Sequence, residues 1–76
     1  MAGYEVIMTA LGRTRRMWFG LDRGQALEEF AHWESCVRHR GQGVAELEGP
    51  DGATEIRSEW DGGECVRYYC RGRASA

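Results

Sequence analysis

One segment of this 76-residue chain has the spacing of an amphipathic helix, and this limits the fold to a single helix that must pack on strands. Between residues 26 and 37, apolar side chains recur at intervals of four, three and four, so they share one face of a helix. Asp22 is placed to cap the N-terminus, and Gly41 to end the helix in the left-handed conformation. We therefore predict a helix over 22–40. Its apolar stripe consists of Ala26, Phe30, Trp33 and Val37.

The segments on either side of this helix alternate apolar and polar residues, which is typical of β-strands. Gly-rich and Pro-containing turns separate them. The order ββαβββ predicts an α+β fold, with the helix on one face of a mainly antiparallel five-stranded sheet. Residues 1–76 form one domain, with a loose tail over about 73–76. The predicted strands cover residues 4–11, 15–21, 44–48, 54–60 and 64–71.

The alternation within each strand also predicts which side chains meet the helix. One residue in two should face the apolar stripe and the other should face away. Together with the stripe and with Leu27, the expected core contains Val6, Met8, Met17, Phe19, Leu21, Leu47, Ile56, Trp60, Val66 and Tyr68.

Charge is unevenly distributed along the chain. All ten basic residues are arginines, and the net charge is −2. Seven of the eight charged residues within 46–64 are acidic, and such asymmetry is typical of a surface that contacts a partner. The arginines gather around the first predicted hairpin (Arg13, Arg15, Arg16 and Arg23) and near the end of the chain (Arg67, Arg71 and Arg73).

The sequence contains no pattern that indicates catalysis or metal binding. No two cysteines have C-x-x-C spacing. A cysteine and a histidine on the predicted helix lack a third group to orient the imidazole. We therefore expect no catalytic residue, no metal and no cofactor. The residues considered were Cys36, Cys65, Cys70, His32 and His39.

The sheet face away from the helix is the candidate binding surface. Trp, Tyr and Arg are enriched at interaction hot spots. The alternative is cross-strand pairing that only stabilises the sheet, with Arg57 between Glu55 and Glu59. The residues predicted to bind a partner are Trp18, Tyr69, Arg16, Arg67, Arg71 and Ile7.

Three kinds of partner fit this surface. The first is a protein partner that the chain inhibits by occlusion. The second is another copy of the chain, because a small domain gains burial by forming a homodimer. The third is nucleic acid, whose bases can stack on aromatic side chains of a sheet. The glutamates on the same face and the acidic net charge oppose phosphate binding, so nucleic acid is the alternative and not the main prediction.

No apolar run approaches the ~20 residues of a membrane-spanning helix, so no membrane partner is expected. The first residues lack the basic start and apolar run of a signal peptide. These features predict a cytoplasmic protein whose cysteines remain thiols.

Four segments carry a resemblance to a known class of proteins: Y-E-V-I, G-R-T-R-R-M-W-F-G-L-D, A-L-E-E-F-A-H-W and G-V-A-E-L-E-G-P-D-G. Their order, a hairpin, a helix and a Gly-led hairpin, resembles small products of phages and mobile elements in GC-rich bacteria. The chain is similar in size and compactness to the single-domain anti-CRISPR proteins. That resemblance implies binding to a Cas effector complex and blocking of target DNA capture. It assigns no functional residue.

Overall fold

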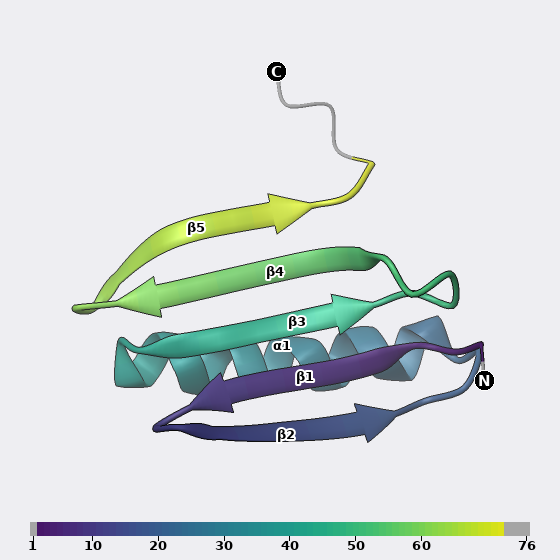
Figure 1. Cartoon of the computed structure of the whole chain (residues 1–76), viewed down its shortest axis with the longest axis horizontal. Helices are drawn as coiled ribbons and strands as arrows, with labels where there is room; N and C mark the ends of the chain where they lie inside the picture. The colour runs from purple at the N-terminus through teal and green to yellow at the C-terminus, as the bar shows by residue number, and fades with distance from the viewer. Residues whose placement is uncertain (1, 73–76) are drawn as a thin grey trace.

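The computed structural model describes residues 2–72 and confirms the predicted α+β fold, with one helix packed on a five-stranded antiparallel sheet (Figure 1). The expected tail over 73–76 lies outside the described residues. The elements are β1 (Glu5–Ala10), β2 (Arg13–Trp18), α1 (Arg23–Arg40), β3 (Gly43–Glu48), β4 (Thr54–Asp61) and β5 (Glu64–Cys70).

The sheet has the strand order β2-β1-β3-β4-β5, and every neighbouring pair is antiparallel. Strands β2 and β3 flank β1, so the chain must cross from one side of β1 to the other. Helix α1 makes this crossing on one face of the sheet (Figure 1). As a result, β2 and β5 are the two edge strands.

The helix ends where the sequence predicts. The Asp22 side chain accepts a hydrogen bond from the Gln25 backbone N–H at 3.0 Å, which satisfies one of the unpaired amides of the first turn. Gly41 has φ 73°, and its N–H donates to the carbonyls of Val37 and Arg38. All four residues of the predicted stripe are buried: Ala26, Phe30, Trp33 and Val37.

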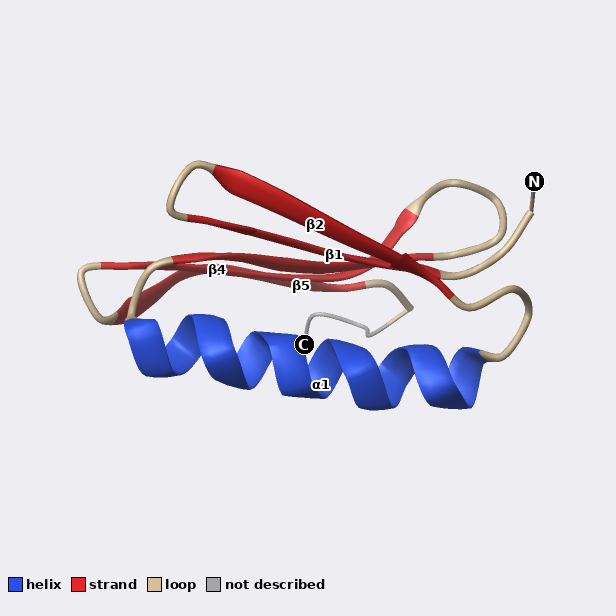
Figure 2. Ribbon diagram, turned by 90° about the horizontal axis from the view of Figure 1, so that it is seen from below, coloured by secondary structure: helices blue, strands red, loops and turns tan. Residues whose placement is uncertain are grey.

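Helix α1 lies along one face of the sheet (Figure 2), and the core fills the space between α1 and the middle of the sheet. From the sheet, Val6, Ala45 and Leu47 are fully buried against the helix stripe. Ala45 was not expected there, because a single alanine in a short strand gives little sequence signal. Partly buried side chains complete the cluster: Tyr4, Met8, Phe19, Leu27, Ile56 and Trp60.

Four residues predicted in the core are instead exposed: Met17, Leu21, Val66 and Tyr68. The reason is the width of the sheet. Five strands span roughly 19 Å between the edge strands, whereas a helix with its side chains is about 10 Å across. Helix α1 packs against β1, β3 and β4, so it leaves the same face of β2 and β5 uncovered. Leu21 lies beyond β2, in the connection to the helix.

The first hairpin turn is tighter than predicted. Ala10 pairs with Arg13, which leaves a two-residue loop of Leu11 and Gly12. Both loop residues have positive φ, 53° and 74° respectively, as a type I′ turn requires. The turn therefore lies at residues 11–12 and not at 12–14. The second strand consequently begins and ends earlier than the predicted 15–21.

The strand pairing shifts register at two places in the second half of the sheet. One lies between Leu47 and Glu48, opposite the start of β4, and it directs Glu55 to Arg23 at the start of α1, at 3.3 Å. Glu55 was expected among the residues that face away from the helix. A second irregularity lies between Glu59 and Trp60 in the pairing with β5.

Candidate binding surfaces on the sheet

A row of ion pairs crosses the sheet face away from the helix, from β2 to β4. Arg16 lies 3.0 Å from Glu5 on the neighbouring strand. Arg57 lies 3.1 Å from Glu46 and 3.6 Å from Glu59. At Arg16 and Arg57, the structure therefore shows the ion pairing across strands that the sequence offered as the alternative to a binding surface. The acidic neighbours of Arg57 are Glu46 and Glu59, and not Glu55.

Ile7 lies within this row and is only 5% exposed. It pairs with Arg16 on one side and with Glu46 on the other. The aliphatic stems of such long side chains cover an apolar neighbour while their charged ends stay in water. Ile7 is therefore buried within this row and offers little surface to a partner, contrary to its predicted role.

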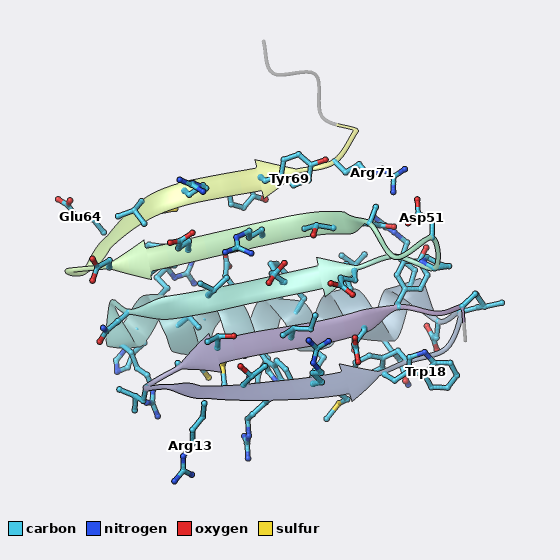
Figure 3. All side chains as sticks on the ribbon, viewed as in Figure 1. Arg13, Trp18, Asp51, Glu64, Tyr69 and Arg71 are labelled. Atoms are coloured by element: carbon cyan, nitrogen blue, oxygen red, sulfur yellow. The ribbon has the colours of Figure 1, made fainter. Side chains whose placement is uncertain are left out.

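Trp18 and Tyr69 are both exposed on this face, but the structure does not bring them together (Figure 3). Trp18 lies on edge strand β2 opposite Glu5, and Tyr69 lies on the other edge strand opposite Arg57. Four strand spacings of about 4.8 Å separate the two edges. The predicted single surface is thus two edge surfaces with a charged row between them.

Trp18 forms one wall of a shallow hollow of about 320 Å³. Its indole lies close over Gly3, where an added Cβ would approach the ring nitrogen to 2.5 Å. Half of the Trp18 surface, 52%, remains exposed to solvent. The hollow therefore combines an exposed aromatic ring with two carboxylates. Its lining residues are Gly3, Glu5, Trp18, Glu48, Gly49, Pro50 and Gly52.

The two arginines predicted on β5 and just beyond it have different surroundings. The Arg71 Nη1 atom donates a hydrogen bond of 2.7 Å to Asp51 in the β3–β4 turn. This bond, assisted by the Ala53 backbone N–H, holds the pKa of the Asp51 carboxyl below its ordinary value, and it raises the pKa of Arg71. Arg67 pairs in register with Glu59 and makes no ion pair with any residue of the described range 2–72. Of the two, Arg71 fixes the end of the strand, and Arg67 remains available to a partner.

A second hollow lies where the β1–β2 hairpin approaches the C-terminal end of α1, and sequence reasoning did not identify it. It measures about 500 Å³ and is lined by Met8, Ala10, Leu11, Arg13, Arg15 and Arg40. The sequence did show arginines grouped around the first hairpin. It could not show that Arg16 and Arg23 have acidic partners, whereas Arg13 and Arg15 have none among the residues described.

The cysteine and histidine side chains are not gathered into a site. Within residues 2–72, no group of three or more His, Cys, Asp or Glu side chains could hold a metal ion. The cysteines are unpaired: Cys36 and Cys65 are exposed, and Cys70 is partly buried.

No protein-family model, no curated protein and no solved structure matches this chain. In the part of the chain that the structure describes, α1 is too polar to cross a membrane.

Proposed function

We propose that this chain is a non-catalytic protein-binding domain that inhibits a macromolecular partner by occlusion. The observation that supports the proposal is that both edge strands carry large apolar side chains in solvent. Met17 and Trp18 are exposed on β2, and Val66 and Tyr69 on β5. Apolar groups of this size on exposed sheet edges are typical of surfaces that bind another protein.

The chemistry of these edges also suits protein recognition. Each edge combines an aromatic ring with an arginine: Trp18 follows Arg15 and Arg16 on β2, and Tyr69 follows Arg67 on β5. Aromatic rings supply contact area at low entropic cost, and Arg supplies directed hydrogen bonds. In addition, an extended partner segment can add to the edge of a sheet through backbone hydrogen bonds.

The specific form that we propose follows the resemblance drawn from the sequence. The chain is an anti-CRISPR-type inhibitor from a phage or mobile element. It acts in the cytoplasm, binds a Cas effector complex and blocks the capture of target DNA. Its size and its two exposed edges suit occlusion, because a small rigid domain can block a binding channel without catalysing a reaction.

The alternative function is a nucleic-acid-binding accessory domain that uses its arginine- and aromatic-bearing sheet face. Arg16 and Arg57 on that face are paired with glutamates, which reduces their attraction for phosphate. A salt series separates the two functions. Binding to generic DNA that falls steeply with salt would favour the alternative.

Affinity capture from a host lysate tests the main proposal. The immobilised chain should retain one partner at a fixed ratio. Trp18→Glu or Tyr69→Glu should abolish that capture by placing a charge at an edge. His32→Glu is the matched control, because His32 is an exposed residue of the helix. Equal capture by all three variants, or no specific capture by the parent chain, would contradict the proposal.

A further inference from the structure

The hollow between the β1–β2 hairpin and the C-terminal end of α1, called here the arginine hollow, has the features of a binding site. Arg13 and Arg15 reach it from edge strand β2, and Arg40 reaches it from the last turn of the helix. Arg13 extends past the free edge of the sheet (Figure 3). Met8, Ala10 and Leu11 supply apolar groups beside these cations, and the lining holds no acidic side chain.

The arginines of this hollow differ from most of the others in the fold. Of the six other arginines within residues 2–72, four are held by a carboxylate; two of these pairs are Arg16 with Glu5 and Arg57 with Glu46. The same applies to Arg23 with Glu55 and Arg71 with Asp51. Over residues 2–72, by contrast, none of the three arginines of the hollow forms an ion pair. Three uncompensated positive charges on one concave surface favour an anionic ligand.

Leu11 gives an independent indication that this surface contacts a ligand. It is 72% exposed, and it is the one residue other than glycine with positive φ in the described chain. A leucine in this conformation strains the turn, and Asn or Gly would relieve that strain. The chain thus carries an exposed apolar side chain at a conformational cost, on the rim of the hollow. Strain of this kind is found where the side chain has a role in binding.

We propose that the arginine hollow binds an acidic segment of a partner protein. Carboxylates of the segment pair with Arg13, Arg15 and Arg40. An apolar side chain of the segment packs on Leu11 and Met8. This inference rests on the proposed protein-binding function and names the chemistry of the partner.

A short acidic peptide fits the observations better than a nucleic acid. The three arginines of the hollow lie together at one end of the molecule, whereas a polynucleotide needs a track of cations along its backbone. Seven of the eight charged residues within 46–64 are acidic, so a long polyanion that extended from the hollow over the sheet would be repelled. A phosphate backbone has no apolar group to pack against Met8, Ala10 and Leu11, whereas a leucine or phenylalanine between acidic residues of a peptide has one.

Fluorescence anisotropy with a labelled synthetic peptide of alternating glutamate and leucine provides the test. The purified chain should bind this peptide more tightly than a single-stranded oligonucleotide of equal charge. Arg13→Gln combined with Arg15→Gln should weaken peptide binding by about tenfold or more. Arg38→Gln is the matched control, because Arg38 is also exposed, has no ion pair in the described range and does not line the hollow. It should change the affinity by less than about twofold.

Leu11→Asn separates binding from folding. Asparagine suits positive φ, so the variant should melt at a higher temperature than the parent chain. It should nevertheless bind the peptide several-fold more weakly, because the apolar contact is lost. Leu21→Asn, which changes another exposed leucine outside the hollow, should leave peptide binding unchanged.

Three results would overturn the inference: no binding of the peptide, equal binding by the hollow and control variants, or tighter binding of the oligonucleotide. If the lysate partner is still captured and the hollow variants do not affect that capture, only this inference fails. If no variant or parent chain captures a partner, the proposed function fails as well.

Discussion

Gly63 donates its backbone N–H to the carbonyl oxygen of Gly41 at 2.9 Å, which joins the β4–β5 turn to the C-cap of α1. The two backbones approach so closely that a Cβ added at Gly41 would lie 2.8 Å from the Gly63 Cα atom. Glycine at position 41 therefore serves two purposes. It adopts the left-handed conformation that ends the helix, and it lets the turn of an outer hairpin dock against the helix end.

Gly41→Ala should destabilise the fold by more than the conformational cost alone. Gly62→Ala is the control, because Gly62 also has positive φ and its Cβ would have open space. The control should cost about 1–2 kcal/mol, the penalty for alanine in the left-handed region. Gly41→Ala should cost about 1–3 kcal/mol more, because packed backbone cannot yield as a flexible side chain can. Urea unfolding of both variants measures the difference, and equal values would show that the close approach does not matter.

Trp33→Ala should cost about 3–5 kcal/mol of unfolding free energy, because a buried indole is removed from the centre of the core. The whole domain is stable by only about 4–11 kcal/mol on the usual scale per residue. The Trp33 indole N–H also donates to the Glu29 Oε2 atom at 2.6 Å. Trp33→Phe keeps most of the apolar volume and loses this bond, so it should cost less than Trp33→Ala. Chemical unfolding followed by circular dichroism measures both. A Trp33→Ala variant as stable as the parent would show that the core is assigned wrongly.

The Arg71–Asp51 pair should be visible in a pH titration. Because Arg71 lowers the pKa of Asp51 in the folded chain, this pair contributes stability above the ordinary titration range of an aspartate. The contribution is lost as the pH falls through the lowered folded pKa. Both groups are exposed to solvent, so the effect on stability is small. The carboxyl carbon shift of Asp51, followed by NMR, should titrate at a higher pH in Arg71→Gln than in the parent chain. Arg67→Gln should leave the midpoint unchanged. Identical midpoints in the parent chain and Arg71→Gln would contradict the pairing.

The main elements could be predicted from the sequence because each has a strong local signal. The stripe from Ala26 to Val37, with a cap at either end, fixes the helix. Alternation and turn residues fix the number of strands. What the sequence could not supply was the position of the helix across the sheet. That position decides whether Val66 and Met17 are buried, and it depends on the strand order, which is a property of long-range pairing.

The sequence predicted which residue types lie on the sheet face away from the helix, but not how they are arranged there. Alternation placed Trp18 and Tyr69 on the same face correctly, yet it could not place them on opposite edges. The partners of the ion pairs could not be predicted from the sequence either, because Arg13 and Arg16 lie in similar sequence surroundings and differ only in their neighbours in the folded chain. The bulge opposite Glu55 reversed one assignment, because a single extra residue in a strand reverses the alternation beyond it.

The chain should form a homodimer through an exposed edge of its sheet. A 76-residue domain buries only about 60% of its unfolded surface, so association offers needed burial. Edge strand β5 presents Tyr69 and Arg67, which has no ion pair within residues 2–72, and a two-fold contact would let each copy supply both residues. Light scattering under reducing conditions at tens of micromolar should give twice the monomer mass. A monomer mass would exclude the dimer.

Substitutions that introduce a charge then identify which edge strand, β2 or β5, forms the dimer contact. Trp18 is half exposed, so Trp18→Glu should leave the monomer folded, and the same holds for Tyr69→Glu. If β5 forms the contact, Tyr69→Glu should restore the monomer mass while Trp18→Glu remains dimeric. Circular dichroism confirms that each variant is folded before its mass is interpreted. A dimer that survives Tyr69→Glu but dissociates in Trp18→Glu would move the contact to β2. That result would leave β5 open to the inhibited partner, because one edge cannot hold both at once.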